Sequence, residues 1–323
     1  MNSRLFIFIA VIVSVLLCTG SFAQVKHGAK TVIKDSSDTE DEKADVELKS
    51  LVDAQYRNSG AGNSYTEAIF KSSRVINGQS IENIPEGVLE FRISHRFGEL
   101  RQGLETSYGF DNATTRLGLN YGLFSWLMIG AGRSTFQKEY DGFLKIRILR
   151  QKAGEGMPLS VSFVSAPSIQ TLPSDVLVPS GTTYNFRDRI YYTNQLLLAR
   201  KFNARFSLQL MPTYIHYNIV TTSDEPNNEI AMGIAGRYKL SKRIALTAEY
   251  YYRLPSYRLN GYSNTLSVGI DIETGGHVFQ LFLTNSADIT ERAVIEETTG
   301  DWAKGGIHFG FNLSRVFNVV KHK

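Results

Sequence analysis

Charged side chains recur at alternate positions within several apolar stretches of this chain, a spacing that could line a passage for ions or small solutes. Successive side chains of a β-strand point to opposite faces, so charges spaced in this way would share one face. The predicted lumen-lining residues are Glu90, Arg92, Arg96, Arg116, Lys145, Arg147, Arg237, Glu249, Arg253 and Asp271. Their excess of basic groups is compatible with an anion-preferring passage. The interpretation that we prefer is that these charges pair across a narrow, plugged lumen and make the structure rigid.

A second group of polar side chains lies in one stretch near residue 280. It comprises His277, Gln280, Thr284 and Asn285. These residues could line a ligand site, or they could receive a plug formed by residues Arg74–Ser80. Turn capping and hydrogen bonds within a lumen are the simpler explanation, and we retain the cluster only as a candidate.

Lipid hydrolysis at a membrane rim is a third possible chemistry, and it needs a serine, a histidine and an orienting Asn or Asp. His95, His277 and His308 fall on expected strands, with Ser94 and Ser286 nearby in sequence. The chain has no Gly-x-Ser-x-Gly elbow, and its six histidines are scattered without metal-ligand spacing. We therefore predict that the protein is not an enzyme and that it has neither a metal site nor a cofactor.

The elements that must position these side chains are about twelve β-strands between residue 88 and the C-terminus. In residues 116–123, for example, Leu117, Leu119 and Tyr121 oppose Arg116 and Asn120. The connections alternate between short and long, as in outer-membrane barrels, with a tight hairpin expected at residues 139–142 as the exception. The pattern predicts an all-β, transmembrane, antiparallel up-and-down β-barrel. Because no sheet edge can remain open in lipid, the first strand must pair with the last.

The last apolar stretch, Gly305–Phe317, is the predicted closing strand. Phe309 and Phe311 fall on its apolar face, whereas Gly306 falls on the opposite face. Gly306, Phe309 and Phe311 also resemble the C-terminal signal that barrel-assembly machinery binds in other outer-membrane proteins, although the chain continues to Lys323. The expected partners are therefore outer-membrane lipid and that machinery, with a small solute as a further possibility.

The N-terminal part of the chain predicts export. Residues 1–23 have the short basic start, apolar stretch and small-x-small end of a signal peptide. The sole cysteine, Cys18, raises a lipoprotein alternative, but Leu17 before it is larger than a lipoprotein signal favours. Residues 24–69 are expected to be a flexible periplasmic segment, and residues 70–323 the barrel. The net charge of +4 is too small and scattered to indicate nucleic-acid binding.

Three stretches carry a family resemblance: residues 70–78 (FKSSRVING), residues 89–98 (LEFRISHRFG) and residues 277–286 (HVFQLFLTNS). Through them the chain resembles a family of uncharacterised membrane-bound β-barrel proteins of Bacteroidetes-like bacteria. The resemblance implies a barrel in the cell outer membrane and offers no catalytic residues. The function that we expect is a small channel, a transporter or a structural membrane component. A rim lipid hydrolase and a soluble periplasmic β-protein remain as alternatives, and residues 288–301 are expected to be a solvated outer loop.

Overall fold

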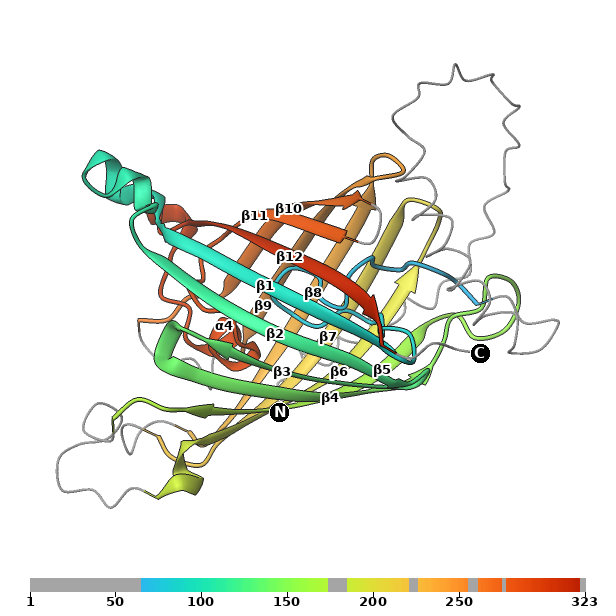
Figure 1. Ribbon diagram of the computed structural model, residues 1–323, viewed down its shortest axis with the longest axis horizontal. Helices are drawn as coiled ribbons and strands as arrows, with labels where there is room; N and C mark the ends of the chain where they lie inside the picture. Colours follow the sequence, from blue (N-terminus) through green and yellow to red (C-terminus); the bar gives the residue numbers. More distant parts are fainter. Residues whose placement is uncertain (1–64, 174–184, 221–225, 255–260, 275–276, 320–323) are drawn as a thin grey trace.

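Twelve antiparallel strands form a closed barrel in the computed structural model (Figure 1), which describes residues 65–173, 185–220, 226–254, 261–274 and 277–319. The strands are β1 (Val88–Glu99), β2 (Ala113–Phe124), β3 (Leu127–Ser134), β4 (Glu139–Leu149), β5 (Ser160–Gln170), β6 (Ile190–Lys201), β7 (Phe206–Tyr217), β8 (Asn228–Lys239), β9 (Ile244–Arg253), β10 (Thr265–Thr274), β11 (His277–Thr284) and β12 (His308–Asn318). Each strand pairs with its neighbours in sequence, and β1 closes the ring on β12, with Val88 opposite Asn318. The predicted fold class and the pairing of the first strand with the last are confirmed.

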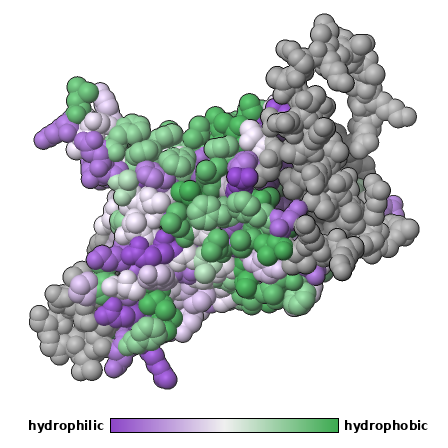
Figure 2. Space-filling model, in the orientation of Figure 1, coloured by the Kyte–Doolittle hydropathy of each residue, from purple (hydrophilic) through white to green (hydrophobic). Residues whose placement is uncertain are grey.

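The two-residue period of the sequence decides which side chains face outward. On β2, Leu117 and Leu119 are 51% and 52% exposed, whereas Arg116 and Asn120 are each 1% exposed. Figure 2 shows hydrophobic side chains gathered over the middle of the barrel wall on this face, with hydrophilic ones toward the end that carries residues 100–109. An aliphatic outer surface and a polar inner surface are the arrangement that a lipid environment stabilises.

The two ends of the barrel differ in their connections. The short-turn end carries the start of β1, the end of β12 and tight turns such as Ser125–Trp126 and Leu240–Arg243. The long-loop end carries the connections 100–112 and 285–307. The expected hairpin at residues 139–142 is wrong, because β4 already begins at Glu139 and pairs there with β5. The turn lies instead at residues 135–138, where Gln137 and Lys138 adopt positive φ.

Short helices occupy the connections. They are η1 (Leu100–Gly109), η2 (Phe136–Lys138), η3 (Phe186–Arg189), α4 (Glu291–Glu296) and η5 (Trp302–Lys304). Every residue of α4 is buried, and α4 contacts β6 and β9 from inside the ring. Among the residues that the structure describes, no helix is both long and apolar enough to cross a membrane.

Predictions for the N-terminal part of the chain fall mostly outside the described residues. The signal peptide, Cys18 and residues 24–64 are among those not described. Of the expected flexible segment, the structure describes only residues 65–69, where Tyr65 forms a β-bridge with Lys152 at the short-turn end. Residues 72–81 are buried inside the barrel, whereas Glu86 and Gly87 pair with Gly122 of β2 at the short-turn end.

Candidate functional site: a plugged lumen

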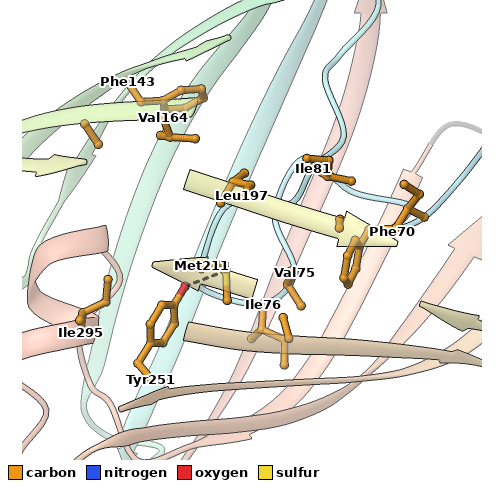
Figure 3. Close-up of a cluster of buried hydrophobic side chains, with 14 of the residues drawn as sticks. Phe70, Val75, Ile76, Ile81, Phe143, Val164, Leu197, Met211, Tyr251 and Ile295 are labelled. Carbon is orange, nitrogen blue, oxygen red and sulfur yellow. Dashed lines mark hydrogen bonds between the residues drawn. The ribbon is translucent and has the colours of Figure 1, made fainter. Parts of the chain in front are cut away.

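Residues 65–87, here called the plug segment, enter the barrel from the short-turn end and turn back before β1. All residues from Ser72 to Ile81 are buried. The turn is a tight hairpin, in which Arg74 and Gln79 form an antiparallel bridge and the Val75 N–H donates to the Gly78 carbonyl (2.9 Å). Figure 3 shows Val75 and Ile76 among side chains of the wall, including Met211 and Tyr251. A hairpin of the chain itself therefore fills part of the lumen.

The tip of the hairpin is held by one buried carboxylate of the wall, that of Glu249 on β9. The backbone N–H groups of Asn77, Gly78 and Ile76 donate to the Glu249 carboxylate at 2.8, 3.1 and 3.3 Å. Successive N–H groups that converge in this way form a concave anion-binding site. A Cβ at Gly78 would overlap the Tyr251 hydroxyl, so only glycine allows the tip to approach the wall this closely.

The side chain of Asn77 makes further contacts with the wall. Its Nδ2 donates to the Ser267 Oγ (2.8 Å), and its Oδ1 accepts from the Arg96 guanidinium. Arg96 is itself oriented by the ring of Phe282, whose centroid lies 4.2 Å from the Arg96 Cζ. Asn77 thus connects β1 with β10 through the hairpin tip.

Several wall donors bind carbonyl groups of the hairpin. The Gln280 Nε2 donates to the Val75 carbonyl, and the Asn312 Nδ2 donates to the Ile76 carbonyl at 3.0 Å. Arg92 holds the Gln280 amide in place, since its Nη2 donates to the Gln280 Oε1 (2.6 Å). The wall therefore supplies hydrogen-bond donors from which the carbonyl groups of a peptide backbone can accept.

Lys145 on β4 binds both arms of the plug segment. Its ammonium donates to the carbonyls of Ser73, Ser80 and Glu82 at 3.2, 3.1 and 2.8 Å. The Ser73 hydroxyl in turn donates to the Glu90 carboxylate of β1 (2.6 Å). Because an ammonium has three donors, Lys145 is fully used by the plug segment.

The connection between β11 and β12 closes the lumen at the long-loop end. Glu291 of α4 accepts from the Arg74 Nη2 (2.6 Å) and from the Gln79 Nε2 (2.8 Å). Arg74 and Glu291 are each only 3% exposed at the side chain. The expectation of a solvated loop at residues 288–301 is wrong, because every residue from 288 to 300 except 297 and 299 is buried, and Glu291 pairs there with the plug segment.

Two acidic groups of this connection, Glu296 and Asp288, are deeply buried, and Glu296 lies beside an arginine of the wall. Arg253 pairs with Glu229 (3.0 Å) and with Glu296 of α4. Burial and the neighbouring Glu229 carboxyl raise the pKa of Glu296 to about 10. Burial, together with the Glu297 carboxylate, raises the pKa of Asp288 well above its ordinary value. One arginine between two carboxyl groups leaves a proton on one of them.

Nine of the ten residues predicted to line a lumen are buried inside the barrel. These are Glu90, Arg92, Arg96, Arg116, Lys145, Arg237, Glu249, Arg253 and Asp271. Arg147 lies at the short-turn rim instead, where its Nη1 donates to the Ser125 carbonyl (2.9 Å). Arg116 forms a bidentate pair with Asp141 across the wall, and Arg237 pairs with Glu273 (3.0 Å).

The predicted basic excess of the lumen is wrong. Glu139, Asp141 and Glu229 are also buried inside the barrel, so the buried strand residues include six bases and six acids. The bases are Arg92, Arg96, Arg116, Lys145, Arg237 and Arg253, and the acids are Glu90, Glu139, Asp141, Glu229, Glu249 and Asp271. Glu139 and Asp141 were hidden by the hairpin expected at their position. The wall therefore gives no basis for anion preference.

The polar cluster near residue 280 does not form one site. Gln280 contacts the plug segment, whereas Thr284 accepts from the Ser267 hydroxyl (2.8 Å). Asn285 donates to the Gly300 carbonyl (2.9 Å) and so fixes the last connection. His277 lies at the short-turn end of β11 and stacks on Phe279 (6.3 Å).

Ser94 and His95, the serine and histidine adjacent in sequence, lie on opposite faces of β1. Ser94 faces the interior, whereas His95 faces outward and stacks on Phe311 at 5.0 Å between ring centroids. His308 is bonded through Nδ1 to the Phe97 carbonyl (2.8 Å). Adjacent residues on opposite faces of a strand cannot form a Ser–His pair. Within the described ranges, no three His, Cys, Asp or Glu side chains group as a metal site.

The residues of the proposed assembly signal lie on and before β12. Phe309 and Phe311 face outward, and Phe309 stacks on Phe97 of β1 (5.9 Å). Gly306 precedes the strand, and its N–H donates to the Asp301 carbonyl (2.9 Å). These contacts fix the seam at which the barrel closes.

The sequence offered weak signals for the residues of the plug. Asn77-Gly78 is a turn dipeptide, and a plug formed by residues Arg74–Ser80 is one of the alternatives that the sequence allows. Nothing in the sequence connects Arg74 with Glu291, which lie 217 residues apart. The pairing appears only when both segments enter the same lumen.

Comparison with known proteins gives one family and a set of distant structures. A family model described as a membrane bound beta barrel domain (DUF5777) matches residues 70–317. Similar solved structures include the NanC porin (9% identity, TM-score 0.43, covering 72% of this chain and 100% of that chain) and the KdgM porin (8%, 0.42, 71% and 99%). Another is the toluene transporter TodX of P. putida (12%, 0.37, 81% and 96%). No curated protein matches the chain.

Proposed function

This chain belongs to the family of membrane-bound beta barrel domains, and from that premise we propose that it is an outer-membrane channel for a small solute, closed at rest by its own plug segment. A closed antiparallel barrel with an aliphatic outer surface is the structure that spans outer membranes, in agreement with the predicted location. We assign it no catalytic role.

The observation that carries the proposal is the way in which the wall charges are satisfied. Lys145 and Glu249 are buried in the wall, yet the hydrogen bonds that they make run to the backbone of the plug segment. A barrel built only for rigidity can pair such charges with each other, as Arg116 and Asp141 do. Charges satisfied by a separable hairpin are what a gate requires, because the wall stays intact when the hairpin leaves.

A structural membrane component is the second candidate. The wall-to-wall pairs Arg116–Asp141 and Arg253–Glu229 favour it, since they rigidify the ring without help from the plug segment. Under this alternative the plug segment is a permanent core of the barrel and no solute passes.

Single-channel conductance distinguishes the two candidates. The perturbation is Gly78→Leu, because any side chain at this position overlaps Tyr251 and forces the hairpin away from the wall without changing a strand residue. The matched control is Gly154→Leu, since a Cβ at Gly154 meets no atom within 4 Å. We expect few openings for the unmodified protein and for the control, and frequent openings for Gly78→Leu. A folded Gly78→Leu barrel that never conducts would refute the channel.

A further inference from the structure

The inner wall of the barrel binds the plug hairpin mainly through groups that every peptide possesses. Gln280, Asn312 and Lys145 donate to its carbonyl groups, and Glu249 accepts from its N–H groups. Gln209 adds another such bond, since its Nε2 donates to the Gln79 carbonyl (2.8 Å). These contacts come from five strands, β4, β7, β9, β11 and β12, and so surround the hairpin.

Apolar side chains of the hairpin are recognised as well. Val75 and Ile76 are each 1% exposed and belong to one buried cluster with Leu197, Met211 and Tyr251 of the wall (Figure 3). Methionine and aromatic side chains adapt to apolar groups of different shapes. The wall therefore combines donors and acceptors for a main chain with an apolar surface beside them.

Displacement of the hairpin would leave buried polar groups without their present partners. An unpaired buried donor or acceptor is costly, and water or another amide-bearing chain must replace the lost bonds. The arrangement of donors and acceptors matches a peptide, because a peptide presents N–H and C=O groups at alternating positions along the chain.

We propose that the lumen wall around Glu249 is an oligopeptide-binding site and that the plug hairpin is its intramolecular occupant. This inference rests on the proposed function, since the site becomes accessible only when the hairpin leaves. The solute class would then be a short peptide with small aliphatic side chains and a glycine next to the Glu249 carboxylate. The glycine is required because the contact with Tyr251 leaves no room for a Cβ.

The probe for this site is a fluorescent synthetic peptide with the sequence of residues 72–81, SSRVINGQSI. Its binding to the full-length Gly78→Leu protein in detergent is measured by fluorescence anisotropy. We expect saturable binding, no binding to the unmodified protein, and at least about tenfold weaker binding after the added change Glu249→Gln. The same peptide carrying Gly78→Leu, and a scrambled peptide, should each bind at least about tenfold more weakly.

Equal binding of the scrambled peptide, or no binding of the native peptide, would overturn the peptide site. If the Gly78→Leu protein does not fold, Ile76→Asp displaces the hairpin by another route, since a charge is not tolerated in the apolar cluster. Conductance separates this inference from the proposed function. Openings without peptide binding would support the proposed channel and refute the peptide site. Specific binding without any openings would support the peptide site and refute the channel.

Discussion

The carboxylate of Glu249 is expected to hold the plug closed, and Glu249→Gln tests this directly. In the native protein two carboxylate oxygens accept three backbone N–H groups, from Ile76, Asn77 and Gly78. Glutamine keeps one oxygen and turns an NH₂ group toward the N–H groups that the other oxygen served. At least one buried N–H then loses its partner, which costs about 1–3 kcal/mol, and the remaining bonds lose their charge assistance, about 1 kcal/mol more.

The combined loss of about 2–4 kcal/mol should weaken docking of the hairpin by a factor of ~30 to ~800. Hydrogen exchange of the amides of Ile76, Asn77 and Gly78 in the folded protein reports this local opening. We expect their exchange to accelerate by that factor, while amides in the middle of the strands keep their protection.

The matched control is Glu229→Gln, which neutralises another buried wall carboxylate. Glu229 is 3% exposed and bonds to Arg253, so its loss should not affect the plug hairpin. Unchanged exchange at residues 76–78 in Glu249→Gln would refute the reasoning. So would equal acceleration in both variants, because general loosening of the barrel would then explain the effect.

Three other predictions concern the last connection and the closing strand. Removing one partner of the buried pair, as in Arg74→Met, should destabilise the folded barrel by about 3–5 kcal/mol in urea unfolding, and the double change with Glu291→Leu should recover much of this. Because the folded-state pKa of Glu296 is raised to about 10, the folded protein binds the extra proton, and stability should fall as pH rises from about 4.5 toward 10. The unmodified protein should therefore lose more thermal stability between pH 6 and pH 9 than Glu296→Gln. Aspartate at Phe309 and Phe311 should prevent membrane insertion, measured by heat-modifiable gel migration and membrane fractionation.

Each of these predictions has a control of similar chemistry. An Arg74→Met variant as stable as the native protein would show that the pair with Glu291 does not hold the plug to α4. Glu155→Gln, in an exposed turn, should leave the pH profile unchanged, and a steep profile that persists in Glu296→Gln would assign it to another group. Val319→Asp, just beyond β12, should insert normally. Normal insertion of the aspartate variants at the two phenylalanines would contradict a lipid-facing seam.

The charged residues inside the barrel show which interior positions can be predicted from strand alternation and which cannot. Alternation identifies Glu90, Arg92 and Lys145 as interior because each lies within a regular strand that the sequence pattern places correctly. Glu139 and Asp141 lie at the start of β4, beside a connection of four residues, and their interior position depends on where the turn begins. A shift of a few residues in one turn thus hid two interior acids, and Glu229 near the start of β8 and Arg147 at the rim account for the rest of the difference in charge.

The sequence by itself determined the wall of this protein. A two-residue period fixes which side chains meet lipid, and the absence of any permissible open edge in a membrane forces β1 to pair with β12. Only the tertiary structure decided what fills the lumen that the wall encloses. Asn77 and Glu249 lie 172 residues apart, and a short hairpin has no periodicity to reveal its partner. The plugged lumen results from closure of the ring, which brings donors from distant strands around one turn of the chain.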